Sequence, residues 1–115
     1  MLNVTMEFSA NRLQLTADGH AGYARMGQDI VCAAASSLMS TLMLALNAQL
    51  GRESDIYFDD PRDGPLTIDC GPSEEDMPGA KMIFRTIACG IEALSFKYPD
   101  NVRFELRETE PLEIE

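Results

Sequence analysis

Histidine, cysteine and basic residues are scarce in this chain of 115 residues, which has one histidine, three cysteines and nine lysines and arginines. One histidine and three scattered cysteines without a Cys-x-x-Cys pair do not match zinc-ligand spacing, so we expect no metal and no cofactor. An odd number of cysteines without framework spacing indicates reduced thiols, and hence a cytoplasmic protein. The N-terminus has no basic segment followed by an apolar run, so we expect no secretory signal.

The excess of acidic residues excludes a further class of function. Nineteen acidic residues against nine basic ones give a net charge of −10. Such a surface repels phosphate backbones, which argues against a nucleic-acid partner. It would attract a basic protein or peptide, although for acidity considered alone solubility is the more common explanation.

Residues 30–50 form a run of 21 residues without a charge, which is long enough to cross a membrane. We nevertheless expect no membrane segment, because the run carries six polar side chains: Ser36, Ser37, Ser40, Thr41, Asn47 and Gln49. A central helix that is buried on most of its surface fits this composition better.

Hydrophobic periodicity predicts seven elements. Alternation of apolar and polar residues predicts strands at 2–8, 12–17, 55–60, 66–70 and 101–107. A helix is expected between Asp29 and Gly51, and a second one is expected between the segment 72–78 and Pro99. The order ββαββαβ predicts a single α+β domain over 1–115, a two-layer sandwich of about five mainly antiparallel strands with two helices on one face. Residues from about 108 to 115 are expected to form a frayed acidic tail.

Each predicted helix has one main apolar face. In the first it comprises Val31, Ala35, Leu38, Leu42, Ala45, Leu46 and Gln49, and in the second Ile83, Phe84, Ile87, Ile91, Leu94 and Tyr98. The second helix carries another stripe nearly opposite, formed by Met82, Thr86, Cys89, Ala93 and Phe96. One helix in a monomer of this size rarely buries two faces, so we expect this stripe to contact a partner, most simply a second copy of the chain.

The only histidine, His20, lies twelve positions before Cys32 in a segment rich in turn and helix-start signals. Asp18-Gly19 is a turn signal at the end of the predicted second strand. Asp29 is placed to cap the predicted first helix, which puts Cys32 in its first turn. The two candidate catalytic side chains are thereby held on separate elements, joined by a loop that Gly22 and Gly27 allow to rearrange.

Two features of this segment favour a reactive thiolate. A free thiol has a pKa of about 8.5, so only a few per cent of it is ionised near neutral pH. The helix macrodipole favours negative charge at Cys32, and His20 is the only imidazole that could take its proton. Free N–H groups of the same turn could hold an oxyanion. Asp29 would oppose the thiolate unless its carboxylate points into the cap.

The alternatives to a catalytic pair stay open at this stage. A lone cysteine beside apolar residues is commonly a small buried hydrophobe, and a histidine near a turn is commonly solvated. Ser36, one turn after Cys32, could hydrogen-bond near the sulfur, although a bond to its own helical turn is the more common arrangement. Cys70 and Cys89 are interpreted as structural.

The sequence resembles a known family at these positions. Gly-His-Ala (19–21), Gly-Gln-Asp-Ile-Val-Cys-Ala (27–33) and Ser36 closely resemble the signature of the ribosomal-processing cysteine protease family, Prp. Chain length, element order and Tyr-Phe-Asp-Asp (57–60) are also similar. The resemblance implies that Cys32 is the nucleophile and that His20 is its general base and later acid.

The same resemblance implies a substrate. Members of this family form homodimers that remove the short N-terminal extension of a large-subunit ribosomal protein before it joins the ribosome. Cleavage follows paired phenylalanines, so we expect an apolar groove near Cys32, which Tyr23 and Met26 could line. The loop 21–28 is expected to close over the peptide. Asp29 either caps the helix or orients the catalytic pair. The rival hypothesis is a non-catalytic acidic module that binds a basic, ribosomal protein, with Cys32 merely packed.

Overall fold

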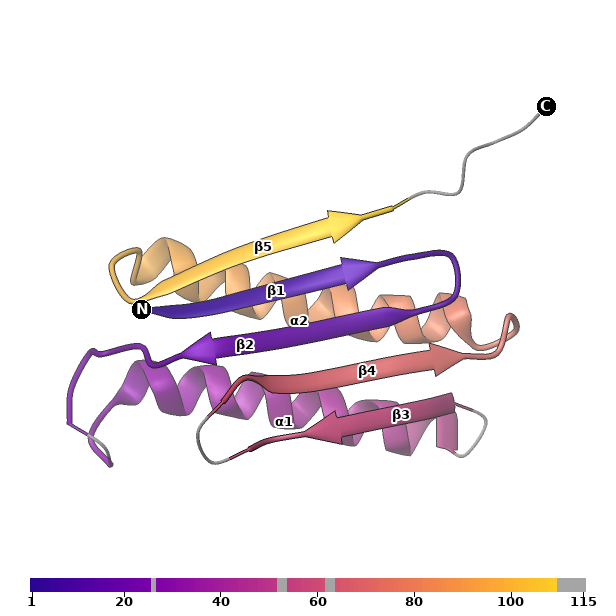
Figure 1. The fold of residues 1–115 in the computed structure, drawn as a ribbon, viewed down its shortest axis with the longest axis horizontal. Helices are drawn as coiled ribbons and strands as arrows, with labels where there is room; N and C mark the ends of the chain where they lie inside the picture. The colour runs from indigo at the N-terminus through magenta and orange to yellow at the C-terminus, as the bar shows by residue number, and fades with distance from the viewer. Residues whose placement is uncertain (26, 52–53, 62–63, 110–115) are drawn as a thin grey trace.

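The predicted order of elements, ββαββαβ, is the order that the chain adopts (Figure 1). The computed structural model describes residues 1–25, 27–51, 54–61 and 64–109. The elements are β1 (Leu2–Phe8), β2 (Leu13–Gly19), α1 (Ile30–Leu50), β3 (Ser54–Asp59), β4 (Leu66–Pro72), α2 (Met77–Lys97) and β5 (Val102–Glu108).

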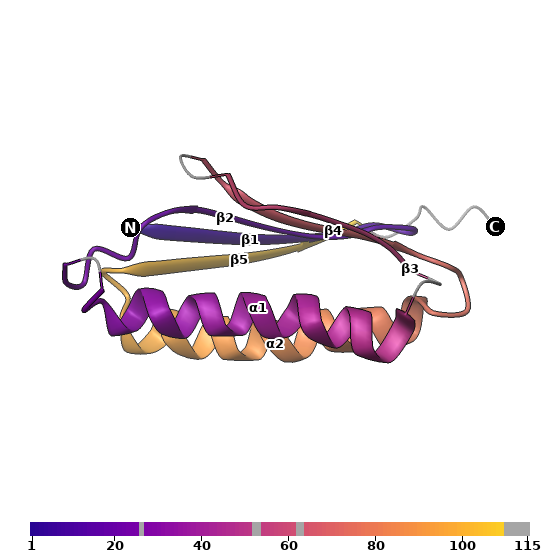
Figure 2. The same ribbon diagram turned by 90° about the horizontal axis from the view of Figure 1, so that it is seen from below.

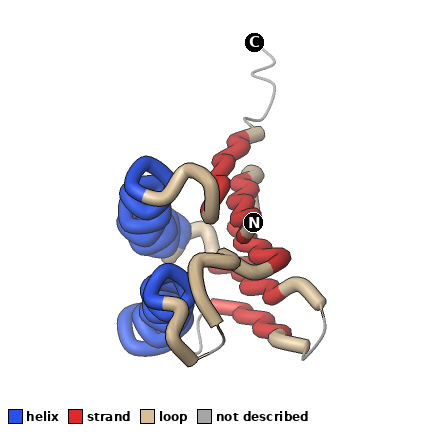
Figure 3. Tube along the Cα trace, turned by 90° about the vertical axis from the view of Figure 1, so that its left-hand side faces the viewer, coloured by secondary structure: helices blue, strands red, loops and turns tan. Residues whose placement is uncertain are grey.

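The five strands form one sheet in the order β3-β4-β2-β1-β5. The pairs β1–β2, β2–β4 and β3–β4 are antiparallel, whereas β5 runs parallel to β1. Figure 2 shows α1 and α2 side by side under one face of the sheet, and Figure 3 shows the same two layers from the end. The prediction of a two-layer, mainly antiparallel α+β fold is therefore confirmed.

The core lies between the sheet and the helices. Alternate residues of β1 and β2 point toward the helices and are buried: Leu2, Val4, Met6, Phe8, Leu13, Leu15 and Ala17. The helices contribute Val31, Ala35, Met39, Leu42 and Leu46 from α1, and Ala80, Phe84, Ile87, Ala88 and Ile91 from α2. Gln49 was wrongly predicted on the buried face of α1. It is exposed, because burial would cost its amide the hydrogen bonds it makes to water.

The two helices approach closely at Gly90. A Cβ built there would lie 2.7 Å from Leu38 Cδ2, so the missing side chain lets α2 pack against α1. By length and composition α1 could cross a membrane, and no other helix in the described part of the chain has that property. Its five buried residues pack against the sheet, which is the position of a core helix.

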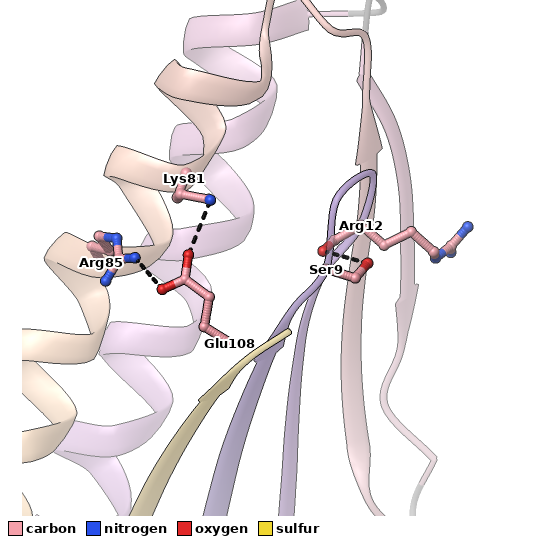
Figure 4. A network of polar contacts seen from close by, with 5 residues as sticks. All are labelled: Ser9, Arg12, Lys81, Arg85 and Glu108. Atoms are coloured by element: carbon pink, nitrogen blue, oxygen red, sulfur yellow. Dashed lines mark hydrogen bonds and ion pairs between the residues drawn. The ribbon is translucent and has the colours of Figure 1, made fainter. Parts of the chain in front are cut away.

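The prediction placed the start of the acidic tail too early in the chain. Glu108 is the last residue of β5, and its carboxylate accepts hydrogen bonds from Arg85 (2.7 Å) and Lys81 (3.1 Å) of α2 (Figure 4). These two cations, Arg85 first, lower the pKa of Glu108. The N–H of Thr109 also donates to the carbonyl of Phe8 at 2.8 Å. Ion pairs to α2 therefore fix the start of the predicted tail, and 110–115 lie outside the described residues.

Candidate active site

His20 directly follows Gly19, the last residue of β2, at which the backbone conformation requires glycine. Gly19 has φ +88°, and a Cβ on it would collide with the carbonyl oxygen of Met1. On the other side of His20, Ala21 is buried and its carbonyl accepts a hydrogen bond from Asn101 Nδ2 at 2.9 Å. The backbone of His20 is thus held at both neighbours, while its side chain is exposed.

Cys32 lies in the first turn of α1, as predicted. Its side chain is half-buried and packs against the hydrophobic core. The helix begins directly after Asp29, whose Oδ1 accepts a hydrogen bond from the Cys32 N–H at 2.9 Å. The role of Asp29 as N-cap is therefore confirmed.

The Asp29 carboxylate also anchors the loop that precedes the helix. Its Oδ2 accepts hydrogen bonds from the N–H groups of Tyr23 (3.0 Å) and Ala24 (3.4 Å). The Cys32 N–H makes the largest contribution to lowering the pKa of Asp29, and the N–H groups of Tyr23, Ala24 and Val31 lower it further. Backbone donors therefore stabilise the negative charge of Asp29. The Cys32 N–H is one of these donors, so in this arrangement it is not among the free N–H groups of the turn that could hold an oxyanion.

A single pocket brings His20 and Cys32 together. It has a volume of about 460 Å³ and is lined by His20, Gly22, Ala24, Gly27, Asp29, Cys32, Ala33 and Ser36. Six of the residues singled out in the sequence thus border one cavity. Of the other two, Met26 lies outside the described residues, and Tyr23 takes a different position.

Tyr23 does not line this pocket. Its ring packs edge-on against that of Tyr98, with the centroids 5.4 Å apart, and its side chain is 48% exposed. In this loop conformation Tyr23 is not among the residues that border the pocket with Cys32, and its role in a substrate groove stays a prediction. An aromatic partner after α2 provides a better contact for the ring than the small residues of the pocket.

Asn101 holds the backbone next to His20, a contact that the sequence did not reveal. It lies 80 positions from Ala21, in the corner between α2 and β5, and a single asparagine after a helix carries no signal of such a contact. Its own N–H donates to the Tyr98 carbonyl at 3.0 Å, and its carbonyl accepts from Leu2 N–H at 2.9 Å. These two backbone bonds fix Asn101 to β1 and to the end of α2. The side-chain amide of Asn101 in turn holds the segment that carries His20.

A thiol at a helix N-terminus and an imidazole on the same pocket are the parts that a thiol-dependent hydrolase requires. The remaining cysteines lie elsewhere: Cys70 is buried in β4 and Cys89 is exposed on α2. This fold and this pocket therefore fit the class of cysteine hydrolases.

Comparison with known proteins agrees with that class. The family described as cysteine protease Prp matches residues 1–103, and the chain belongs to this family of ribosomal-processing cysteine proteases. The ribosomal processing cysteine protease Prp of Staphylococcus aureus, in strains Mu50 and NCTC 8325, is 26% identical over 106 residues. That match covers 92% of this chain and 97% of the relative.

Solved structures share the fold. The crystal structure of the S. aureus protease Prp with a covalently linked product peptide has a TM-score of 0.76 and 25% identity, covering 93% of this chain and 100% of that one. SMU.848 from Streptococcus mutans has a TM-score of 0.73 at 24% identity, with 95% and 96% covered, and shows the fold alone. The chain is an enzyme, a cysteine protease.

Proposed function

We propose that this enzyme removes the N-terminal extension of a large-subunit ribosomal protein before ribosome assembly, with Cys32 as nucleophile and His20 as general base and acid. The observation that carries the proposal is the pocket that both side chains line in a chain of the Prp family. The S. aureus relative has been crystallised with a covalently linked product peptide, which supports an acyl-enzyme route.

The proposed chemistry proceeds in two halves. His20 takes the proton from Cys32 as the sulfur attacks the scissile carbonyl, and it then gives that proton to the leaving amine. The bond from carbonyl carbon to nitrogen breaks, and a thioester remains on Cys32. His20 next takes a proton from water, whose oxygen attacks the thioester, and the thiol leaves with that proton as the new C-terminus is released. Asp29 maintains the helix start and the loop around this exchange through its three backbone contacts.

The acidic surface supports a basic substrate. With a net charge of −10, the enzyme would attract a ribosomal protein through long-range electrostatics, and rRNA would be repelled. The free ribosomal protein is therefore the proposed substrate, and cleavage should slow as salt screens the attraction.

We also propose a homodimer in the cytoplasm. The predicted second stripe on α2 is exposed in the single chain, with Met82 at 67% and Phe96 at 77%. Thr86, Cys89 and Ala93 between them are exposed as well. Apolar side chains of this size gathered on one helix face favour burial against a second copy. Light scattering that shows a monomer at micromolar concentration would refute the dimer.

The test of the protease function is incubation with a peptide spanning such an extension and its junction, followed by mass spectrometry. The wild type should yield two products that add up to the substrate plus one water. Cys32→Ala should yield none while it keeps its thermal unfolding temperature, since little volume is lost. Cys89→Ala, outside the pocket on α2, is the control for the loss of a thiol. Because Cys89 lies in the stripe proposed to form the dimer, light scattering must first show the wild-type assembly, and this variant should then cleave normally. Full activity of Cys32→Ala would remove the mechanism.

The rival function, a binding module without chemistry, makes a different prediction for iodoacetamide. A thiolate activated in the pocket should be alkylated near pH 6, where ordinary thiols react slowly. Free cysteine in solution serves as the standard, because it is fully accessible whereas the proposed dimer would cover Cys89. A faster reaction at Cys32 than at free cysteine then cannot be explained by accessibility, and equal rates would favour the binding module.

A further inference from the structure

Two aromatic rings join the loop that follows His20 to the corner between α2 and β5. Tyr23 packs edge-on against Tyr98, with the ring centroids 5.4 Å apart and the ring planes at 76°. Figure 2 shows the loop after β2 and the corner at the same end of the molecule. Neither tyrosine is among the residues that line the pocket with Cys32. The pair can therefore act on that pocket only through the backbone that it holds.

Tyr98 is the fixed member of the pair. Its N–H donates to the carbonyl of Leu94 at 2.8 Å, and its carbonyl accepts the N–H groups of Asn101 and Val102, each at 3.0 Å. Its side chain is partly buried and packs against the hydrophobic core. Tyr23, in contrast, is 48% exposed and lies in a loop. The ring of Tyr98 is therefore the support, and the ring of Tyr23 is the part that it holds.

The residues on either side of Tyr23 form one wall of the pocket. Gly22 and Ala24 both line the pocket beside Cys32, whereas Tyr23 between them does not. The N–H groups of Tyr23 and Ala24 donate to the Asp29 carboxylate at 3.0 Å and 3.4 Å, in positions exposed to solvent. Hydrogen bonds that exchange with water contribute only modest net stability. The contact between the rings is therefore a substantial part of what holds this pocket wall, the segment 22–24.

Gly22 separates two supports that come from the same corner. Before it, the carbonyl of Ala21 accepts a hydrogen bond from Asn101, and after it the ring of Tyr23 packs on Tyr98. Gly22 has φ +66° and carries no side chain that would hinder rotation about its backbone bonds. The bond to Ala21 therefore does not fix the residues after Gly22, which need the second support.

We propose that Tyr98 is a positioning residue that holds Tyr23 and thereby keeps the pocket wall in place for the substrate. The proposal rests on the proposed protease function and assigns to this pocket a support that acts on substrate binding. A peptide binds only to molecules whose wall is in place, so the apparent affinity falls with the fraction of such molecules. A bound peptide itself keeps the wall in place, so the chemistry at His20, which has its own support from Asn101, is unchanged.

The test measures kcat and KM separately for cleavage of the extension peptide. Tyr23→Ala should raise KM about fivefold, while kcat changes less than about twofold. A fivefold change corresponds to about 1 kcal/mol, which lies within the range for an edge-to-face aromatic pair. Tyr98→Leu, which keeps an apolar side chain against the core, should give the same rise. The double variant should also show about a fivefold rise, because both substitutions remove one and the same contact.

Conservative variants and a matched control separate positioning from a general effect on the fold. Tyr23→Phe and Tyr98→Phe keep both rings, so KM should stay within about twofold of the wild-type value. Tyr57→Ala removes a ring on β3 that is 57% exposed and lies outside the pocket, and it should change neither constant. All variants are compared well below their unfolding temperatures, so that reduced stability alone does not alter KM.

The remaining outcomes decide against one proposal or the other. Normal cleavage with KM within about twofold of wild type in Tyr23→Ala or in Tyr98→Leu overturns the positioning role. A rise of about 25-fold in the double variant also overturns it, because the two rings would then act separately, and so does a fivefold rise in either phenylalanine variant. The affinity of the peptide for Cys32→Ala, with and without Tyr23→Ala, tests the wall without chemistry. A fivefold loss of that affinity, with no cleavage by wild type, would refute the protease function and support the positioning role.

Discussion

Asn101 offers a sharp test of how the fold positions His20. Its amide donates to the carbonyl of Ala21 at 2.9 Å, and Ala21 is 1% exposed. Asn101→Ala therefore leaves a buried carbonyl without this donor, which costs about 1–3 kcal/mol. For a chain of this length each kcal/mol lowers the unfolding temperature by about 4 °C, so thermal unfolding should shift down by about 4–12 °C.

The same substitution should lower turnover more than binding. His20 is bonded directly to Ala21, and a misplacement of about 1 Å at a catalytic group can cost about a hundredfold in rate. We predict that kcat for peptide cleavage falls between tenfold and a hundredfold while KM changes less than about twofold, measured well below the unfolding transition. A role confined to stability would not produce this split between kcat and KM.

Two further variants control the measurement. Asn101→Asp keeps the size of the side chain but replaces the donor by an acceptor, so it should lose kcat at least as severely. Asn47→Ala, at an exposed position on α1, should change neither stability nor kcat appreciably. Asn101→Ala with a lowered unfolding temperature and an unchanged kcat would refute the reasoning, because the hydrogen bond would then stabilise the fold without positioning His20.

Three other substitutions test separate parts of the structure. Asp29→Asn removes a carboxylate whose pKa is lowered from 3.8, so its stabilisation is complete above pH 3.8 and is lost as pH falls through the lower folded value. The difference in unfolding temperature between wild type and Asp29→Asn should therefore be largest at neutral pH and should shrink below about pH 4. A difference that stays constant down to about pH 2 would contradict this. Gly19→Ala should destabilise the chain by about 1–3 kcal/mol in urea unfolding and reduce cleavage. The control, Gly71→Ala, should be tolerated, because a Cβ added at Gly71 would meet no atom outside its chain neighbours closer than 3.8 Å. Phe96→Glu should convert the proposed dimer to a monomer in light scattering without lowering the stability of the single chain.

Strong periodic signals in the sequence predicted the architecture well. The strand expected at 2–8 has those bounds in the structure, because one of its faces is buried throughout and alternation is then fully specified. Asp29 and Gly51 likewise delimit α1 as expected, since each satisfies backbone groups that the helix leaves unpaired. The parallel pairing of β5 with β1 had no such signal in either strand.

Contacts between distant segments could not be predicted from the sequence. Asn101 and Ala21 meet only because β5 starts beside the start of β1, at the end of the sheet where the antiparallel strand β2 finishes. Glu108 resembled part of an acidic tail, and its place in β5 depends on two cations on α2. The position of Tyr23 depends on Tyr98, again a partner supplied by the fold. The local motif therefore predicted the position of Cys32 in the first turn and the Asp29 cap, while the contacts around His20 required the tertiary structure.

The central claim is that Cys32 carries the acyl group during cleavage. The most direct measurement mixes the enzyme with the extension peptide, quenches it in acid within a turnover and maps the modified residue by mass spectrometry. We predict that the fragment containing Cys32 gains the mass of the N-terminal product less one water, and that the fragment containing Cys89 stays unmodified. Cleavage that proceeds with no acyl group on Cys32 at any time point, or with the group on another residue, would contradict it.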